Sequence, residues 1–503
     1  MTSKAKIMAK GSFLRISNLL FNIISSLFLM PFLIHALGDK VYGLWVLIVS
    51  IGSFYWLFDL GVGSALERYV SKALAKNDHL EANQIINTTL FCFLIFGVLF
   101  FLFCVGITFF LHLFIKDTLL IGLAKQIVLL LGLNLAVGLP MRAFSGILSA
   151  HMRFDIGSTI ELLKDIIRVA SIVIFFKFYA GIWTLALITC GIDVFGYILL
   201  WFVIKRIAPY FELAIKHVTR AQFPYLFNYS MTTFVIKIAD RLRYNIDNFV
   251  ISAFVDLNAV TMYSVGFRLN GYLGFFVTGA LGMFIPLFSR YEGAGDYENL
   301  RSKFLFLTKI SAYFSMFLGG MLIILGGPFI QRWMGSAYMP GYYVLVILAI
   351  PSIFASAQNP SIQLLYGVSK HKFYAITNII EGVMNLVLSL ILVKKMGMIG
   401  VAWGTAIPMA FMAVLVQPVY VCKIIKYPLM KYYSLFFVSL FKGCACLGIV
   451  YFCINRLIAA DYLQLIVTGA IFTITYSAVI FFWGFSSEER NKFLAILKPK
   501  PAV

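Results

Sequence analysis

Long hydrophobic stretches separated by short polar connections run along the whole chain. A stretch of about 20 apolar residues is long enough to cross the hydrocarbon core of a bilayer as a helix. Fourteen such spans are expected, near residues 12–37, 41–62, 84–115, 119–150, 156–179, 181–204, 223–255, 259–289, 303–331, 341–367, 373–394, 398–422, 432–457 and 462–485. The predicted fold class is therefore an all-α polytopic membrane protein with about fourteen transmembrane helices.

The seventh span interrupts this apolar pattern with an ionic face. Its polar residues are Lys237, Asp240, Arg241, Arg243, Tyr244, Asp247 and Asn248. On a helix all but Arg243 fall within an arc of roughly 120°. Each charge near the middle of a bilayer costs roughly 2.5–3.5 kcal/mol on insertion scales. The face is therefore expected to border water, protein or ligand instead of lipid.

Two further spans carry polar stripes. In the fifth span the stripe comprises Glu161, Lys164, Asp165 and Arg168, and in the eleventh Asn378, Glu381, Asn385 and Ser389. Span one adds Arg15, Asn18, Asn22, Ser25 and Ser26. The seams are expected to point inward, although in span five the i,i+3 pairs Glu161–Lys164 and Asp165–Arg168 would also serve simply to hold a bundle together.

Cationic residues dominate the ionic face of span seven. Lys237 and Arg241 lie at i,i+4 and repel each other unless an anion lies beside them. Arg142 in span four and Arg268 in span eight add guanidinium groups, whose planar fork suits phosphate oxygens. An anionic ligand such as a phosphate or pyrophosphate is expected, and the alternative is a set of purely structural ion pairs.

Carboxylates inside the spans are candidates for ion coupling, because burial and neighbouring charge shift the pKa of a carboxyl group. These candidates are Asp59, Glu161, Asp165, Asp240, Asp247 and Glu381. Asp193 is ranked below Glu161 and Glu381. The expected coupling ion is H⁺ or Na⁺, and no cofactor is expected, since the chain has no Walker-type nucleotide loop. The cysteines lack metal-ligand spacing, so no metal site is predicted.

Charge and composition fix the membrane class and the orientation. The chain is 61% hydrophobic and only 12% charged, yet its net charge is +20. With the N-terminus inside, lysines and arginines favour the expected cytoplasmic segments over the outer loops roughly threefold, as the positive-inside rule requires. The basic residues therefore indicate topology, not nucleic-acid binding. Both termini are expected in the cytoplasm, and no outer loop is long enough for a catalytic domain.

A shift of about 220 residues aligns the first six spans with the next six. It pairs Glu161 with Glu381 and Trp183 with Trp403. Two six-helix bundles related by a pseudo-twofold axis are therefore expected, as in transporters that expose a central site alternately to each side. The predicted parts are an N-terminal bundle at 1–204, a basic cytoplasmic linker at 205–222, a C-terminal bundle at 223–425, and two peripheral helices with a cytoplasmic tail at 426–503.

The opening of the chain carries a family likeness. The segment Leu37–Trp45 (LGDKVYGLW), followed by Phe58–Gly63 (FDLGVG) and Arg68–Val70, resembles the bacterial polysaccharide flippases, the Wzx or polysaccharide-transport branch of the MOP superfamily. Members of that branch move undecaprenyl-diphosphate-linked oligosaccharides, such as O-antigen repeat units, across the bacterial cytoplasmic (inner) membrane. The resemblance implies an ion-coupled, alternating-access transporter that is not an enzyme and that works beside polysaccharide polymerase and chain-length machinery.

The resemblance assigns the cationic residues to the diphosphate and sugars of such a cargo. The expected substrate-binding residues are Arg15, Asn22, Lys164, Arg168, Lys237, Arg241, Arg243 and Arg268. The lipid II flippases and the multidrug and toxin extrusion transporters share the implied fold and remain alternatives, although a cationic drug would prefer an anionic cavity. A membrane polysaccharide polymerase or ligase is the alternative from the enzyme class.

Overall fold

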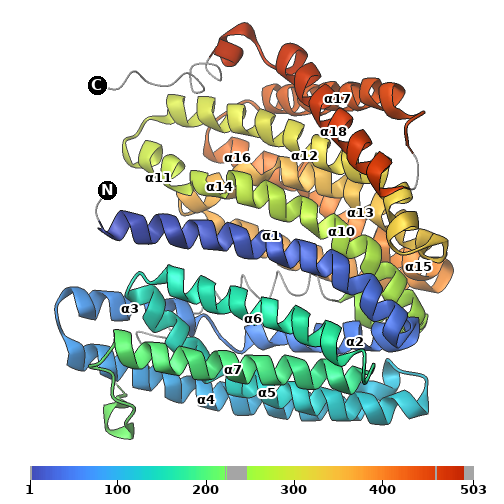
Figure 1. Ribbon diagram of the computed structural model, residues 1–503. Helices are drawn as coiled ribbons and strands as arrows, with labels where there is room; N and C mark the ends of the chain where they lie inside the picture. The colour runs from blue at the N-terminus through green and yellow to red at the C-terminus, as the bar shows by residue number, and fades with distance from the viewer. Residues whose placement is uncertain (1–2, 221, 224–245, 459–460, 492–503) are drawn as a thin grey trace. The chain divides into compact units, whose positions relative to one another are not determined.

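A computed structural model describes residues 3–220, 222–223, 246–458 and 461–491, and within them the secondary structure is helical without a β-strand (Figure 1). The contacts within the chain divide it into two compact units, Met1–Thr261 and Met262–Val503. This division falls within one helix, whereas the sequence suggests a linker at 205–222. The predicted assignment of 1–204, 205–222, 223–425 and 426–503 to bundles, linker and peripheral helices stays a prediction.

The first unit is built from long helices that run alongside one another (Figure 1). In chain order they are α1 (Ser3–Leu37), α2 (Asp39–Gly52), α3 (Val62–Ala75), α4 (His79–Phe110), α5 (Thr118–Ala150), α6 (Phe154–Phe175), α7 (Ile182–Ile207) and α9 (Asp247–Phe254). Helix α1 packs on α6, α6 on α7, α7 on α5 and α5 on α4. The charged faces of α1, α6 and α7 therefore meet inside one bundle.

The second unit repeats the use of long apolar helices. Its elements are α10 (Leu257–Leu281), which carries the boundary between the units, α11 (Ile285–Gly293), α12 (Tyr297–Trp333), α13 (Met339–Ala357), α14 (Asn359–Gly367), α15 (His371–Phe411), α16 (Gln417–Ile424), α17 (Leu429–Ile454) and α18 (Tyr462–Val479). Helix α12 is central, because it packs against α13, α17 and α18.

Eleven helical segments in the described part of the chain are long and apolar enough to cross a membrane. One of them, Lys372–Ile424, contains the expected spans eleven and twelve, which are separated by a kink at Gly397 with a φ of 57°. Helix α6 falls outside the eleven because its stripe carries too many charged residues, although the helix is apolar on average. Expected span seven lies mostly outside the described residues. The expectation of about fourteen helices in an all-α membrane fold agrees with this arrangement.

Large apolar side chains are also abundant on the exterior of the helices. Phe13, Phe109 and Phe178 are among the many that are exposed. Water would penalise such a surface at about 25 cal/mol for each Å² of apolar area, whereas lipid tails accept it. The chain is a multi-pass membrane protein.

The second span is shorter than its hydropathy predicts. Helix α2 gives way to a 3₁₀ turn at Ser53–Leu57, and Leu60 and Gly61 then adopt φ values of 48° and 78° before α3 begins. Glycine enters this left-handed region freely, whereas a leucine there is strained. The break turns the side chain of Asp59 into the unit, where its exposed fraction is 0%. Two successive left-handed residues therefore position a buried carboxylate.

Gly43, within the motif at Leu37–Trp45, lies where α2 meets the start of α10. A methyl group at this position would collide with the carbonyl oxygen of Leu257. We expect Gly43→Ala to lower the stability of the protein by about 1–3 kcal/mol, because the backbone of α10 has to move. Thermal melting followed by size-exclusion chromatography in detergent measures the change.

Gly122 in α5 provides the matched control, since a methyl group there meets no atom within 4 Å. Gly122→Ala is expected to leave the melting temperature unchanged or slightly raised, because alanine is the better helix former. Equal melting temperatures for both variants would contradict the close α2–α10 contact.

Candidate functional site

The first unit contains a polar cavity of about 550 Å³ between α1, α3, α5, α6 and α7. Its basic lining residues are Arg15, Arg142, Arg153 and Lys164, and its acidic ones are Glu67 and Glu161. Tyr55, Trp56, Phe154 and Tyr197 add aromatic rings. Arg142, Arg153 and Lys164 each pair with a carboxylate just outside the lining, so Arg15 is the lining cation left to attract an anion.

Arg142 lies at the centre of this lining. Its guanidinium stacks 4.0 Å from the ring centre of Trp56, and its Nη2 lies 3.5 Å from Oδ2 of Asp59. Its Nη1 is buried and has no hydrogen-bond partner among the described residues. The guanidinium is thus held on two sides while one donor remains available for a ligand oxygen.

The other charged residues of the cavity differ in how well they are neutralised. Arg153 forms a bidentate pair with Asp155, with N–O distances of 3.0 and 3.2 Å. Arg15 is exposed, lies 5.3 Å from the ring centre of Phe154, and has no carboxylate within ion-pair distance in the described part of the chain. Glu161 is also exposed and accepts no hydrogen bond from a described residue. Arg15 and Glu161 are therefore available to a ligand or an ion.

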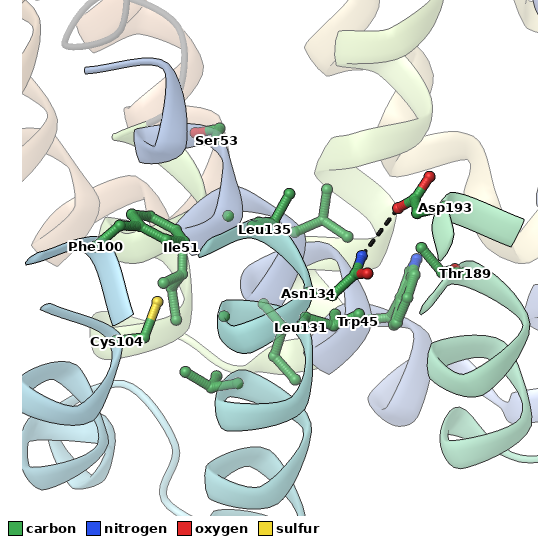
Figure 2. A pocket seen from close by; sticks show the side chains of 15 residues that line it. Trp45, Ile51, Ser53, Phe100, Cys104, Leu131, Asn134, Leu135, Thr189 and Asp193 are labelled. Carbon is green, nitrogen blue, oxygen red and sulfur yellow. Dashed lines mark hydrogen bonds between the residues drawn. The ribbon is translucent and has the colours of Figure 1, made fainter. Parts of the chain in front are cut away.

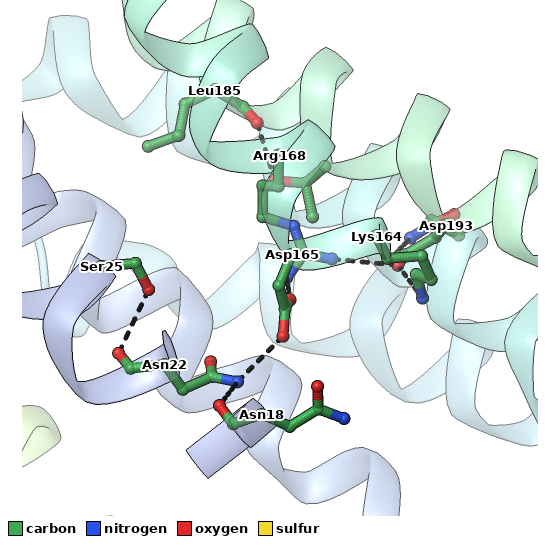
Figure 3. Close-up of polar contacts among 10 residues, drawn as sticks. Asn18, Asn22, Ser25, Lys164, Asp165, Arg168, Leu185 and Asp193 are labelled. Carbon is green, nitrogen blue, oxygen red and sulfur yellow. Dashed lines mark hydrogen bonds and ion pairs between the residues drawn. The ribbon is translucent and has the colours of Figure 1, made fainter. Parts of the chain in front are cut away.

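Lys164 and Arg168 belong to a neutral network between α1, α6 and α7 (Figure 3). Lys164 Nζ and Arg168 Nη2 both contact Oδ1 of Asp193, at 2.8 and 3.3 Å. Arg168 Nη1 also lies 3.3 Å from Oδ1 of Asp165, whose other oxygen accepts a 2.9 Å hydrogen bond from Asn22. Two cations here face two carboxylates, so the network ties the helices together.

Asp193 also contacts a second cavity, which is apolar and has a volume of about 290 Å³ (Figure 2). Asn134 of α5 donates a 2.9 Å hydrogen bond to Oδ2 of Asp193. Trp45, Phe100 and Cys104 supply much of the remaining wall. Asp193 of α7 is therefore the common partner of polar side chains on α5 and α6.

Of the remaining predicted site residues that the structure describes, none lines the cavity. Arg268 is exposed on α10 in the second unit, and Glu381 is buried in α15 of the same unit. Asp247 is buried at the start of α9 in the first unit. Lys237, Asp240, Arg241 and Arg243 lie outside the described residues. Their assignment to the site stays a prediction.

The structure makes two pairings that the sequence analysis did not anticipate. Lys164 pairs with Asp193 of α7, and not with Glu161 one turn away, so the i,i+3 alternative is wrong for this pair. Arg142 pairs with Asp59 across α5 and the α2–α3 break. The available signal was the single acidic residue in each of spans two and six, because a lone charge in an apolar span requires a partner.

The geometry suits electrostatic binding more than bond chemistry. The described residues contain no group of three or more His, Cys, Asp or Glu side chains that could hold a metal ion. Arg142 has an unpartnered Nη1, Arg15 has no carboxylate partner among the described residues, and aromatic rings line the same cavity. Together these groups can bind an anionic group attached to a sugar.

Three proteins resemble the chain, two of them over most of its length. The "Uncharacterized membrane protein EpsK" of Bacillus subtilis is 22% identical, covering 81% of this chain and 82% of the relative. A "Putative O-antigen transporter" of Shigella flexneri is 23% identical, covering 78% and 92%. The "Probable low-salt glycan biosynthesis flippase Agl15" of Haloferax volcanii is 24% identical over a shorter stretch, 38% of this chain and 40% of that protein.

Solved structures confirm the predicted fold. An inward-facing multidrug resistance MATE transporter of the MOP superfamily superposes with a TM-score of 0.70 at 15% identity, covering 82% of this chain and 98% of the other. The lipid II flippase MurJ in an inward closed conformation gives 0.68 at 18% identity, covering 92% and 98%. The model of the polysaccharide biosynthesis protein family matches residues 37–342, well over half of the chain. The resemblance seen in the sequence is confirmed, and the chain belongs to this polysaccharide biosynthesis family within the MOP fold.

Proposed function

We propose that this protein is a flippase that moves an undecaprenyl-diphosphate-linked oligosaccharide, such as an O-antigen or other surface polysaccharide repeat unit, across the bacterial cytoplasmic membrane. It works by alternating access, with both termini in the cytoplasm, and it hands its cargo to polymerase and chain-length proteins without catalysing a reaction itself. The observation that carries the proposal is the cavity of the first unit, which is lined by basic and aromatic side chains.

The cavity supports a diphosphate-sugar cargo through two kinds of contact. Arg15 and the spare donor of Arg142 are suited to diphosphate oxygens, since arginine binds phosphate in a planar, bidentate manner. Trp56, with an exposed fraction of 42%, offers the apolar ring surface on which sugars pack. Lys237, Arg241, Arg243 and Arg268 are proposed as further anion-binding residues.

The size of the cavity indicates that it binds the headgroup of the cargo and not its polyprenyl tail. A volume of about 550 Å³ accommodates a headgroup but not a tail of about fifty-five carbons. Moving that tail out of lipid into a wet cavity would cost about 0.8 kcal/mol for each methylene. The polyprenyl chain is therefore proposed to remain in the bilayer while the headgroup crosses.

Ion exchange is the proposed driving force, with H⁺ or Na⁺ as the coupling ion. Among the candidate carboxylates, Asp59 and Asp165 face guanidinium groups, and Asp165 also accepts a hydrogen bond from Asn22. Glu161 lines the cavity and accepts no hydrogen bond from a described residue. It is the carboxylate best placed to exchange an ion with the cavity, ahead of Asp240, Asp247 and Glu381.

The other transporters of this fold are distinguished by cargo charge. A cationic drug is disfavoured by a lining in which basic groups outnumber acidic ones. Lipid II carries the same diphosphate as the proposed cargo, and the lipid II flippase fold covers 92% of this chain, so it is the second candidate. Leaflet-resolved detection of lipid-linked oligosaccharide, lipid II and a fluorescent cation in one set of reconstituted vesicles separates the three.

Arg15→Ala tests the cationic site without a folding complication. Arg15 is exposed and has no carboxylate partner in the described part of the chain, so its removal is expected to leave the melting temperature unchanged. Leaflet transfer of lipid-linked oligosaccharide is expected to fall about tenfold, the effect of losing about 1.4 kcal/mol of charge-assisted binding. The same direction is expected for Lys237→Ala and Arg241→Ala.

Lys125→Ala is the control, because Lys125 is an exposed cation on α5 that does not line the cavity. It is expected to transfer cargo at the wild-type rate. If Arg15→Ala and Lys125→Ala behave alike, the cavity is not the headgroup site. Transfer of the fluorescent cation in preference to both diphosphate lipids would instead favour a drug exporter.

A further inference from the structure

The second unit contains a larger cavity, of about 950 Å³, which shares no residue with the candidate headgroup site. It is lined by α12, α17 and residues 486–489 after α18. Its lysines are Lys303, Lys309, Lys431 and Lys442, and its carboxylates are Glu488 and Glu489. The sequence predicts α17 and α18 to be peripheral helices outside the two six-helix bundles, and the proposed transport path assigns no role to this cluster.

Two helix faces line this cavity with the same alternation of basic and apolar groups. On α17 the residues Lys431, Leu435, Val438 and Lys442 follow a helical spacing of four, three and four, so they share one face. On α12, Lys303, Phe306 and Lys309 also share a face. The lysines of α17 are separated by about 16 Å along the helix, enough to reach from a headgroup region into the hydrocarbon layer.

One of the four lysines is neutralised within the protein. Lys309 Nζ lies 2.7 Å from Oε2 of Glu489, which also accepts a 2.7 Å hydrogen bond from the backbone N–H of Ser486. Burial raises the pKa of Glu489, but these hydrogen bonds outweigh it and hold the pKa below its usual range. The pair fixes the segment after α18 against α12.

The other lysines lack such a partner. Lys303, Lys431 and Lys442 have no carboxylate within ion-pair distance among the described residues. Lys442 donates only to the carbonyl oxygen of Trp483, at 3.3 Å, and lies 5.7 Å from the centre of that ring. Like charges gathered in one cavity repel, and basic pockets between transmembrane helices are typical sites for anionic lipid headgroups.

We propose that this cavity binds one anionic phospholipid of the surrounding bilayer, such as phosphatidylglycerol. Lys303 and Lys431, near the starts of the two helices, hold the phosphate end, an acyl chain lies along Phe306, Leu435 and Val438, and Lys442 lies deeper, beside Trp483. The charge distribution of the sequence predicts this end of α12 and α17 to be cytoplasmic, where anionic lipid attracts basic groups. The site is independent of the proposed flippase function.

Trp483 provides the readout, because its ring is exposed and adjoins Lys442. The purified protein is placed in vesicles containing brominated phosphatidylglycerol or brominated phosphatidylcholine at equal mole fraction. Quenching of tryptophan fluorescence that occurs in the wild type and is absent in Trp483→Phe is assigned to this site. Brominated phosphatidylglycerol is expected to bind about tenfold more favourably than the zwitterionic lipid.

Lys303→Gln/Lys431→Gln, which changes two exposed positions only, is expected to remove this preference, and Lys431→Gln/Lys442→Gln is expected to reduce it. The matched control Lys372→Gln/Lys423→Gln removes two exposed lysines outside the cavity and is expected to retain it. Equal quenching by both lipids in the wild type would overturn the site.

Two competitors identify the occupant. Relief of quenching by millimolar inorganic phosphate would show a simple anion site and overturn the assignment to a lipid. Relief by undecaprenyl phosphate at a hundredfold lower mole fraction than phosphatidylglycerol would identify a polyprenyl lipid and overturn the assignment to a bilayer phospholipid. Persistence of quenching against both supports the proposal.

Discussion

Arg142→Ala is expected to abolish transfer of lipid-linked oligosaccharide and to destabilise the protein. The guanidinium that faces Asp59 and stacks on Trp56 is lost, and Asp59 is fully buried. Removing one partner of a buried charge pair typically costs about 3–5 kcal/mol, because the other charge stays in a poor solvent. Thermal melting in detergent measures the stability, and leaflet-resolved transfer in vesicles measures the function.

The double variant Asp59→Asn/Arg142→Gln separates the two losses. It removes both charges and keeps polar groups of similar size, so the melting temperature is expected to recover most of the way towards wild type. Transfer is expected to stay lost, because the cavity still lacks the guanidinium. Recovery of transfer together with stability would show that Arg142 only neutralises Asp59, and would remove it from the headgroup site.

Asp193→Asn is expected to cause the second large effect, on the packing of α5, α6 and α7. Lys164 and Arg168 then lose the carboxylate that they share, while Asn134 can still donate to the new amide oxygen. Arg168 keeps Asp165 as a partner, but Lys164 is left partly buried without a carboxylate, which is expected to cost about 3 kcal/mol. The melting temperature should fall clearly, and Asp193→Asn/Lys164→Gln should recover part of the loss by removing one cation.

Asp117→Asn supplies the surface control. Lys40 Nζ contacts Asp117 Oδ2 at 2.7 Å, and this hydrogen bond holds the pKa of the Asp117 carboxyl below its usual range. The pair's contribution is present above the usual pKa of an aspartate and is lost as the pH falls through the lowered value. Exposed pairs contribute little, so Asp117→Asn is expected to leave the melting temperature unchanged at neutral pH. If Asp117→Asn and Asp193→Asn lowered the melting temperature equally, Asp193 would contribute no more to stability than a surface carboxylate.

The α2–α3 break and the kink at Gly397 differ in how far hydropathy predicts them. Hydropathy predicts one span at 41–62, but the chain leaves the helix near Ser53 and passes through left-handed residues at Leu60 and Gly61. A hydropathy average over about 20 residues does not register two backbone dihedral angles. The kink at Gly397 fell between two predicted spans because polar residues already marked that boundary.

The family and the chemical class of the cavity were accessible from the sequence. The motifs at Leu37–Trp45 and Phe58–Gly63 indicated the family that the comparison confirms. Arg15, Lys164 and Glu161 were predicted to lie at a polar interior, and all three line the cavity. Arg142 was recognised as an additional guanidinium but not as the group with a stacked ring and a spare donor.

The sequence by itself determined the membrane class, the helices and the inward placement of charge. A bilayer requires every backbone group to be hydrogen-bonded within a helix and charges to avoid lipid, so apolar length and charge position carry this information directly. Only the tertiary structure decided which charges meet. Lys164 pairs with Asp193 because α7 lies against α6, and Arg142 pairs with Asp59 because the α2–α3 break turns that carboxylate inward. Such pairings depend on distances between separate helices, which spacing along one helix does not contain.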